Sequence, residues 1–392
     1  MNRLMASALA IVGLGATISA LELKPRVAIC AAASASVTAA QFTDPQAKLV
    51  STNMFATVDI IHAGTSTPLV SQLSDYDAVM VWSNTNFQNS TTLGDNLADY
   101  VDAGGGVVVT MFANSTTSAN RFLLGRWSPN YEVIPKNGGN LSSGGAQGLG
   151  NILVPGHPIL NGVNSFTAGT SAFRPVSILL QPGCTLIAQW TDGKTLIAVG
   201  TTDKRVDLGM YPPSSDVVST YWSAASDGAK LMGNALDFAR AWHWYVPDTY
   251  TVDSGEEFGG DLQSLVASDD NSLQVFNDAT SLVAQVSMSI NGGFTNPSAM
   301  RVMAETSVAR PGLSEAILME DFINGGYDVL IGRVATTTDT LATVDLTTSA
   351  ATYVSGSGGM NGRVTWMPIN DEDPSQDGWL HTVDMFKVRL TE

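Results

Sequence analysis

The chain has 392 residues, of which 44% are hydrophobic and only 14% are charged. This length suffices for two or three domains, and the composition excludes a disordered chain and a coiled coil. Thirty-six acidic residues against 19 basic ones give a formal net charge of −17 at pH 7. Residues 246–392 hold 21 of the acids and 6 of the bases, a net charge of −15. The uneven charge predicts two domains, and the lack of a basic stripe excludes nucleic-acid binding.

Residues 1–20 have the features of a secretory signal peptide. The basic Arg3 precedes an uncharged run over residues 4–20, which ends in the small residues Ser19 and Ala20. The run is short for a membrane-spanning helix and no basic stop-transfer cluster follows it. The alternative is a first strand or helix of the core. We expect cleavage of this segment, no transmembrane anchor afterwards, and a secreted, periplasmic or cell-surface protein.

Residues 24–245 predict an α/β domain, because apolar runs of strand length alternate with helical patterns. A helix is expected to begin with Asp44 as its N-cap and Pro45 in its first turn. Another carries Leu93, Leu97 and Val101 on one face, with Gly104 at its end. Short turns between such elements imply parallel strands and a flavodoxin-like parallel α/β sandwich. Strands are expected at residues 26–33, 58–62, 76–82 and 107–112, and helices at residues 44–55 and 69–73.

The second half of this domain has weaker patterns. Residues 137–151 are rich in Gly, Ser and Asn and predict a surface loop. A closing helix is expected over residues 227–244. Further strands are expected at residues 177–180, 185–190, 195–199 and 206–210. The two cysteines, Cys30 and Cys184, are expected to be thiols, although one long-range disulfide is the alternative in an oxidising compartment.

Four segments in this order resemble the class I glutamine amidotransferase-like superfold, in particular its ThuA-like branch. They are residues 76–82 (YDAVMVW), 97–109 (LADYVDAGGGVVV), 156–162 (GHPILNG) and 208–213 (LGMYPP). The resemblance implies a cysteine nucleophile after a core strand, together with a His-Pro-Glu step. Here the turn holds Ala113-Asn114-Ser115-Thr116, and Tyr211-Pro212-Pro213 stands at the His-Pro-Glu step. Glutamine hydrolysis by a Cys-His-Glu triad is therefore not expected.

Open parallel sheets bind ligands beyond the carboxyl ends of their strands. The hydroxyl, amide and aromatic groups expected at those ends suit a neutral polyol or sugar, although they could equally be ordinary loop residues. His157 and Tyr211 are the candidates for a rebuilt catalytic site, and for His157 the alternative is a structural hydrogen bond within its loop. The candidates for a ligand-binding crevice are Ser34, Trp82, Ser83, Asn84 and Asn114.

Residues 248–392 predict an acidic antiparallel β-sandwich, in the manner of a jelly roll, because runs of period two recur at short spacing. Asn-Gly-Gly turns at residues 291–293 and 324–326 separate some of the runs. The segment 259–275 resembles a sandwich module that is appended to large secreted bacterial proteins and has no assigned activity. Strands are expected at residues 280–290, 300–307, 315–321, 328–334, 341–346, 363–368 and 380–390.

Clustered acids in the sandwich suggest a structural calcium ion as the one candidate cofactor, since Ca²⁺ prefers six to eight oxygen ligands. A solvated acidic surface is the alternative. The candidate ligands are Asp269, Asp270, Asp371, Asp373 and Asp377.

Three functions fit the sequence. The first is a secreted or cell-surface, non-catalytic binding or structural protein, in which the sandwich attaches the chain to carbohydrate or cell-envelope components. The second is a carbohydrate-active hydrolase or isomerase with a site rebuilt around His157 and Tyr211. The third is a purely structural envelope protein. An open crevice lined by converging polar groups would favour the enzyme, and a filled one would favour the scaffold.

Overall fold

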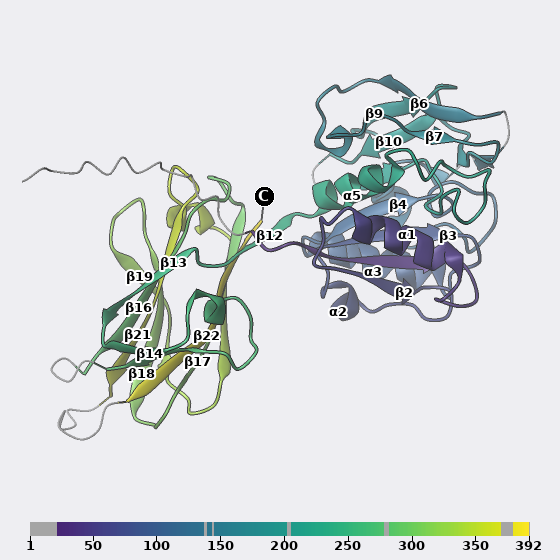
Figure 1. Ribbon diagram of the computed structural model, residues 1–392. Coiled ribbons are helices and arrows are strands. Elements are labelled where there is room, and N and C mark those ends of the chain that lie inside the picture. Colours follow the sequence, from purple (N-terminus) through teal and green to yellow (C-terminus); the bar gives the residue numbers. More distant parts are fainter. Residues whose placement is uncertain are drawn as a thin grey trace, which may run out of the picture. The chain divides into compact units, whose positions relative to one another are not determined.

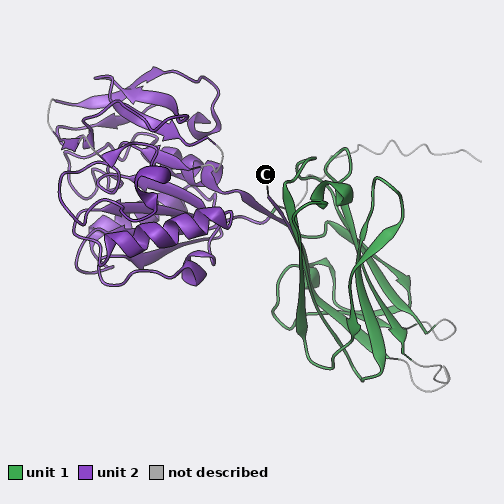
Figure 2. Cartoon of the chain, turned by 180° about the vertical axis from the view of Figure 1, so that it is seen from behind, with its two compact units in different colours: residues 1–22, 245–388 green, residues 23–244, 389–392 purple. Residues whose placement is uncertain are grey.

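The computed structural model describes residues 22–136, 139–142, 145–201, 205–277, 282–369 and 379–391. The chain divides into two compact units, which Figure 2 shows in different colours. One is an α/β unit that contains Leu23–Trp244, and the other is a β unit that contains Tyr245–Val388. The predicted signal peptide lies outside the described residues, as do Asp371, Asp373 and Asp377.

The α/β unit is built on one mixed sheet with strand order β2-β1-β3-β4-β11-β10-β9-β6-β7 (Figure 1). Its strands are β1 (Arg26–Ala32), β2 (Thr57–His62), β3 (Ala78–Ser83), β4 (Gly106–Thr110), β6 (Gln147–Ile152), β7 (Thr167–Ala168), β9 (Thr185–Trp190), β10 (Thr195–Val199) and β11 (Val206–Leu208). A separate small sheet joins β5 (Asn140–Leu141) to β8 (Arg174–Pro175). The helices are α1 (Ala40–Ser51), α2 (Val70–Leu73), α3 (Ser90–Asp102), α4 (Trp127–Asn130) and α5 (Gly228–Ala239).

The first half of this sheet is parallel, as the alternation of strands and helices predicts. β1 pairs in parallel with β2 and β3, β3 with β4, and β4 with β11. Buried side chains of α1 and α5 pack on one face, and those of α3 pack on the other. The apolar positions predicted for α3 are confirmed, since Leu93, Leu97 and Val101 are buried. Because helices cover both faces of the sheet, its uncovered edge is the one formed by the ends of the strands.

The second half of the sheet is antiparallel, so the expectation of a purely parallel sandwich is wrong for this half. β10 pairs antiparallel with both β11 and β9, and β6 pairs antiparallel with β9. The physical reason is connection length, because only residues 191–194 join β9 to β10. A parallel crossover requires a dozen or more residues, whereas a tight turn produces an antiparallel hairpin. The predicted strand at residues 177–180 is absent, and the predicted loop at residues 137–151 contains β5 and most of β6.

Two predicted helix ends are also wrong. α1 begins at Ala40, and Asp44 lies inside it, where its carboxylate accepts hydrogen bonds from the backbone N and Oγ of Ser214 at 2.7 and 2.9 Å. Asp44 therefore ties the helix to a distant loop and does not cap it. α5 ends at Ala239 because Arg240 adopts an extended conformation and its guanidinium bonds the Trp242 carbonyl. The predicted end of α3 is confirmed by Gly104, which has a φ of 95° directly after the C-cap.

The β unit is the expected antiparallel sandwich (Figure 1). One sheet runs β14-β15-β22-β17-β20 and the other runs β13-β16-β21-β18-β19. The seven strands predicted by period two all exist, with ends shifted by up to four residues. The strands are β13 (Thr249–Ser254), β14 (Glu256–Gly259), β15 (Leu273–Phe276), β16 (Ala284–Ile290), β17 (Ala299–Val308), β18 (Leu313–Glu320), β19 (Tyr327–Val334), β20 (Thr340–Leu346), β21 (Met360–Pro368) and β22 (Leu380–Thr391).

A buried network of hydrogen-bonded polar side chains lies between the two sheets of the sandwich. The Glu315 carboxylate is 2% exposed and accepts hydrogen bonds from Arg333 Nε at 2.8 Å, Trp366 Nε1 at 2.9 Å and Thr306 Oγ1 at 2.6 Å. Thr306 belongs to β17 of one sheet, whereas the other three residues belong to β18, β19 and β21 of the other. Around them, alternate side chains of β16 and β21 are buried. The network fixes how the two sheets face each other.

Cys30 and Cys184 both lie in the described part of the chain and are not joined by a disulfide; Cys30 is buried, whereas Cys184 is only half-buried. Cys30 is buried in β1, and burial raises the pKa of its thiol to about 12. Among the residues that the structure describes, no helix has the length and apolar character needed to cross a membrane.

Candidate functional site

Three of the predicted crevice residues do lie at the carboxyl ends of the parallel strands. Ser34 follows β1, Ser83 ends β3, and Asn84 comes next in the chain. Ser83 is buried, and its hydroxyl donates to the Arg121 carbonyl. Asn84 is exposed, and its backbone N–H donates to the Ala32 carbonyl at 2.7 Å. Of the three, Ser34 and Asn84 reach solvent.

The structure places the other two crevice candidates in the interior. Trp82 is fully buried in the core on the α1 and α5 face, where its ring lies 6.5 Å from that of Phe42. Asn114 is also buried, and its Nδ2 donates to the Val109 carbonyl at 3.3 Å. These two side chains therefore support the sheet and are not available to a ligand. Trp82 lies within β3 and Asn114 follows β4, and the burial of both side chains excludes them from a ligand-binding crevice.

Aromatic side chains fill the crevice beside β4 and β11. The ring of Tyr211 lies 5.5 Å from Phe112, 5.6 Å from Phe173 and 5.3 Å from Tyr221. The cavity next to this cluster has a volume of about 10 Å³, which is room for about one water molecule. Burial raises the pKa of the Tyr211 hydroxyl, which therefore stays protonated at neutral pH. A filled crevice of this kind is what the scaffold hypothesis requires.

His157 is held in a structural arrangement away from this cluster. Its Nδ1 accepts a hydrogen bond from the Ile159 backbone N–H at 3.3 Å, which caps the 3-10 helix η2 (Pro158–Leu160). Its ring lies 4.7 Å from that of Phe238 in α5. Partial burial lowers the pKa of His157, so the ring is neutral at pH 7. The two catalytic candidates thus have separate surroundings, His157 against α5 and Tyr211 among aromatic rings.

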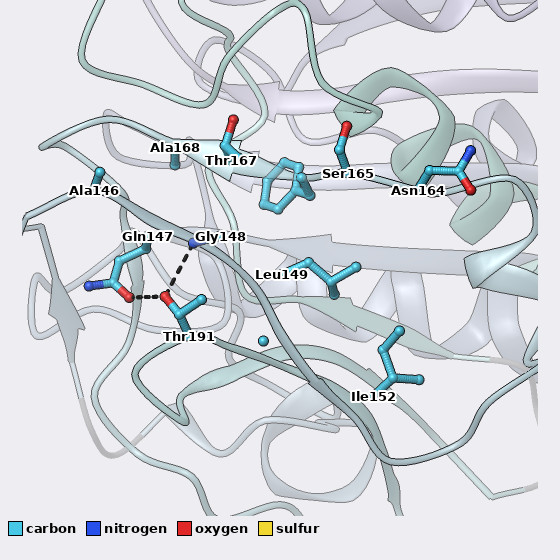
Figure 3. A pocket seen from close by; sticks show the side chains of 12 residues that line it. Ala146, Gln147, Gly148, Leu149, Ile152, Asn164, Ser165, Thr167, Ala168 and Thr191 are labelled. Atoms are coloured by element: carbon cyan, nitrogen blue, oxygen red, sulfur yellow. Dashed lines mark hydrogen bonds between the residues drawn. The ribbon is translucent and has the colours of Figure 1, made fainter.

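A groove of about 510 Å³ lies in the antiparallel half of the α/β unit (Figure 3). Residues 146–150 and Ile152 of the β6 region form one wall, residues 164–168 form the other, and Thr191 completes the lining. Thr191 Oγ1 donates to Gln147 Oε1 at 2.6 Å and accepts from the Gly148 backbone N–H at 3.3 Å. Figure 3 shows this paired end of the groove and, away from it, the side chains of Leu149 and Ile152.

The second wall of the groove is fixed to the start of α5. The Asp227 carboxylate accepts from the backbone N–H groups of Asn164 at 2.9 Å and Ser165 at 2.8 Å. These bonds lower the pKa of Asp227, which is therefore ionised at neutral pH. Phe166 anchors the same wall in the core, with its ring 5.2 Å from that of Trp190. The groove is therefore preformed, because both walls are bonded to regular elements.

A close backbone approach shapes the first wall. A Cβ atom on Gly150 would lie 2.4 Å from the Trp190 carbonyl oxygen, so only glycine fits against β9 here. The pairing of β6 with β9 shifts register between Leu149 and Ile152 at this point. The resulting irregularity separates β6 from the regular ladder, as bulges commonly do near binding sites.

The chemistry of the groove is neutral. None of its lining residues is an acid, a base or a histidine, although the whole chain carries 36 acids. The hydroxyls and amides come from Gln147, Asn164, Ser165, Thr167 and Thr191, and the apolar surface comes from Leu149, Ile152, Phe166 and alanines. Sequence patterns missed this site, because its lining comes from three separate segments. The one available signal was the lack of charge in residues 137–151.

Two of the five predicted calcium ligands, Asp269 and Asp270, lie among the described residues. Asp269 and Asp270 lie in a loop whose backbone N–H groups donate to Asp384 Oδ2 at 3.1 and 3.4 Å. Asp384 is 1% exposed, its Oδ1 has no hydrogen-bond partner, and desolvation raises its pKa. Within the described ranges, no three acidic, histidine or cysteine side chains group closely enough to hold a metal ion. Calcium binding therefore stays a prediction.

One face of the sandwich carries a bonded row of polar side chains. Asp253 of β13 accepts from Gln285 Nε2 at 2.9 Å and from the hydroxyl of Ser287, both in β16. Arg363 of β21 donates to Ser287 Oγ at 2.9 Å and lies 3.9 Å from the centre of the Tyr327 ring. We call Asp253, Gln285, Ser287, Tyr327 and Arg363 the polar row. It offers hydrogen-bonding groups and an aromatic ring on the outer side of one sheet.

No family model matches the chain, and no curated protein matches it. Among solved structures, a ThuA-like protein from Bacteroides uniformis is similar to it at 13% identity, over 56% of this chain and 93% of that one, with a TM-score of 0.41. A second is TmCBM61 in complex with β-1,4-galactotriose, at 11% identity over 37% of this chain and 86% of that one, with a TM-score of 0.24. A CBM4 structure is similar at 16% identity over 38% and 94%, with a TM-score of 0.22. Likeness at this level assigns neither a family nor a function.

Proposed function

We propose that this chain is a non-catalytic binding protein that holds a neutral carbohydrate in the groove between β6 and residues 164–168. The observation that carries the proposal is a preformed groove of about 510 Å³ whose lining holds five hydroxyl or amide side chains and no charged one. Ligand sites of this size combine apolar surface with a few oriented polar groups. The hydroxyl and amide groups of the groove match the hydroxyl groups of a sugar as donors and acceptors.

The alternative, a carbohydrate-active hydrolase or isomerase, has less support. Acid–base catalysis requires ionisable groups within hydrogen-bond reach of the reacting atoms. The groove lining contains none, His157 is bonded within its own loop, and Tyr211 is buried among aromatic rings. A binding role needs only the groove itself.

Export and attachment complete the proposal. The leader-like pattern of residues 1–20 supports secretion or display at the cell surface. The polar row supports an attachment role for the sandwich, since aromatic rings and fixed polar groups together suit the two faces of a sugar. In this proposal the α/β unit binds a soluble or surface carbohydrate and the sandwich attaches the chain to carbohydrate or other envelope components.

The groove is tested by screening the full chain on a glycan array, followed by calorimetric titration with the best neutral oligosaccharide. Thr167→Trp places a large ring on an exposed residue of the groove wall and should abolish binding. Thr191→Ala removes the bond to Gln147 and should weaken binding about fivefold, since a hydrogen bond is typically worth about 1 kcal/mol.

Thr185→Trp is the matched control, because Thr185 is exposed at the start of β9 and does not line the groove. It should bind like the unchanged chain. Equal binding by Thr167→Trp and Thr185→Trp would place the carbohydrate elsewhere, and an array without any neutral ligand would contradict the proposal. For the sandwich, Tyr327→Ala should reduce retention of the chain on insoluble polysaccharide while leaving the groove titration unchanged.

A further inference from the structure

A second feature of the α/β unit is the arginine at the carboxyl edge of its parallel strands. Arg121 lies in the segment that follows β4, and its backbone carbonyl accepts the Ser83 hydroxyl at the end of β3. The next residue but one, Leu123, donates from its backbone N–H to the Ala113 carbonyl at 3.2 Å. These bonds fix the backbone of Arg121 across the ends of two neighbouring strands.

The guanidinium group of Arg121 is held by neutral partners. Its Nη2 donates to Asn84 Oδ1 at 3.4 Å, and its Cζ lies 4.6 Å from the centre of the Phe112 ring. No carboxylate among the described residues lies within ion-pair distance of it. Six other arginines of the chain do have carboxylate partners, namely Arg126, Arg174, Arg240, Arg301, Arg333 and Arg363.

Arg121 is also partly withdrawn from water. Its side chain is half-buried, and Nε is a buried donor without a partner. Desolvation lowers the pKa of the guanidinium, although arginine stays charged at any physiological pH. A desolvated positive charge without a counter-charge is unfavourable for the empty protein, and an anion would compensate it.

Aromatic and amide groups surround the Arg121 guanidinium. The Tyr211 ring packs on the same Phe112 ring, 5.5 Å between centres, so Arg121 and Tyr211 border one aromatic side chain. The Tyr211 hydroxyl has no hydrogen-bond partner among the described residues. Asn84 is exposed and holds one edge of the guanidinium in a fixed orientation. The planar guanidinium binds carboxylate and phosphate oxygens in pairs, and this edge of an open α/β sheet is where ligands bind.

We propose that Arg121 is the charged residue of a second binding site, which takes a small oxyanion, a carboxylate or a phosphate group, at the carboxyl edge of β3 and β4. Asn84 accepts a hydrogen bond from the guanidinium, and the Phe112 ring packs against it. The site is separate from the neutral groove, whose lining includes none of these residues. It does not depend on the carbohydrate proposal.

The test is a titration of the full chain with inorganic phosphate and, separately, with acetate, at constant ionic strength set with sodium chloride. Binding is followed by calorimetry and by the shift in thermal midpoint. We expect saturable binding of at least one anion, and a loss of at least tenfold in affinity in Arg121→Gln. Phosphate binding alone would identify a phosphate group as the ligand chemistry, and acetate binding alone would identify a carboxylate.

Arg126→Gln is the matched control, because it removes the same charge from the same unit at an arginine that already has the partners Asp99 and Asp102. It should retain the affinity of the unchanged chain within twofold. If Arg121→Gln fails to fold, Arg121→Lys keeps the charge but not the planar donor pair, and should weaken binding about threefold or more. The absence of saturable binding of both anions, or equal affinities in Arg121→Gln and Arg126→Gln, would overturn the proposal. Thr167→Trp should leave anion binding unchanged, which separates this site from the groove.

Discussion

Two buried carboxylates, one in each unit, differ in how fully their oxygens are hydrogen-bonded. Glu315 in the sandwich has donors on both oxygens, from Arg333, Trp366 and Thr306. Asp207 in the α/β unit is equally buried, at 2% exposed, but only Oδ2 has a partner, the Ile134 backbone N–H at 2.9 Å. Its Oδ1 has no partner of normal hydrogen-bond geometry, and repulsion from Glu132 is larger than the stabilisation by either Asn114 or Arg205.

The difference shows that burial of an acid does not by itself indicate a ligand site. Both oxygens of the Glu315 carboxylate have donors, so this residue acts as a structural link between the sheets. Burial raises the pKa of Asp207 to about 7, so this residue is largely protonated in mildly acidic solution and costs stability when it ionises. The candidate sites instead lie where the lining is neutral or where a positive charge lacks a partner.

The largest effect on stability is expected from removal of the Glu315 carboxylate, because both of its oxygens accept hydrogen bonds. Glu315→Ala leaves the Arg333 charge and the Trp366 and Thr306 donors without their acceptor, and should reduce the free energy of unfolding by about 3–5 kcal/mol. Denaturant unfolding followed by tryptophan fluorescence measures the change. Glu256→Ala, at an exposed position in β14, should cost less than about 0.5 kcal/mol. Similar costs for both variants would contradict the structural role, and Glu315→Gln serves if the alanine variant does not fold.

The second largest effect should be a gain in the free energy of unfolding, on replacement of Asp207. Because the pKa of Asp207 is about 7 in the folded state and 3.8 as the ordinary value, the folded chain holds an extra proton between these pH values. Its contribution to stability is present at low pH and is lost as the pH rises from about 4 through 7. Asp207→Asn keeps the acceptor for Ile134 and avoids the ionisation, so it should be more stable by about 4 kcal/mol at pH 8, at about 1.4 kcal/mol per pKa unit.

The advantage of Asp207→Asn over the unchanged chain should shrink towards pH 4. Urea unfolding at pH 4, 6 and 8 measures it. Asp75→Asn is the control, because Asp75 is exposed, and its stability curve should run parallel to that of the unchanged chain. A gain for Asp207→Asn that is the same at every pH would show that ionisation is not the cause.

The smallest effect concerns another buried carboxylate, Asp384 of the sandwich. If the acidic loops hold calcium, a Ca²⁺ concentration ten times the dissociation constant should stabilise the metal-free chain by about 1.4 kcal/mol. Asp384→Asn should reduce this gain, because Oδ1 of Asp384 is the buried oxygen that lacks a partner beside Asp269 and Asp270. Thermal unfolding with EGTA and with added Ca²⁺ measures the gain. Identical thermal midpoints in both conditions would contradict calcium binding by this unit.

Elements with a strong local pattern could be predicted from sequence. The spacing of Leu93, Leu97 and Val101 predicted the buried face of α3, and the alternation in residues 284–290 predicted β16. Buried positions recur about every fourth residue on a helix and every second residue on a strand, so they can be recognised in the sequence. The start of α1 could not be predicted, since Asp44 bonds Ser214, 170 residues further along the chain. Nor could the direction of β9 and β10, which depends on their short connection and on the pairing that follows it.

The candidate sites show the same division. Sequence alone determined that the net negative charge lies in residues 246–392, and it placed Ser34, Ser83 and Asn84 at the carboxyl ends of core strands. Only the tertiary structure decided that Trp82 and Asn114 point inward, that Phe112 and Tyr211 fill the crevice, and that Arg121 has no carboxylate partner. The groove likewise joins residues 146–152, 164–168 and Thr191, which no periodicity connects. Local patterns record what each segment buries, whereas a binding site depends on which distant segments the fold brings side by side.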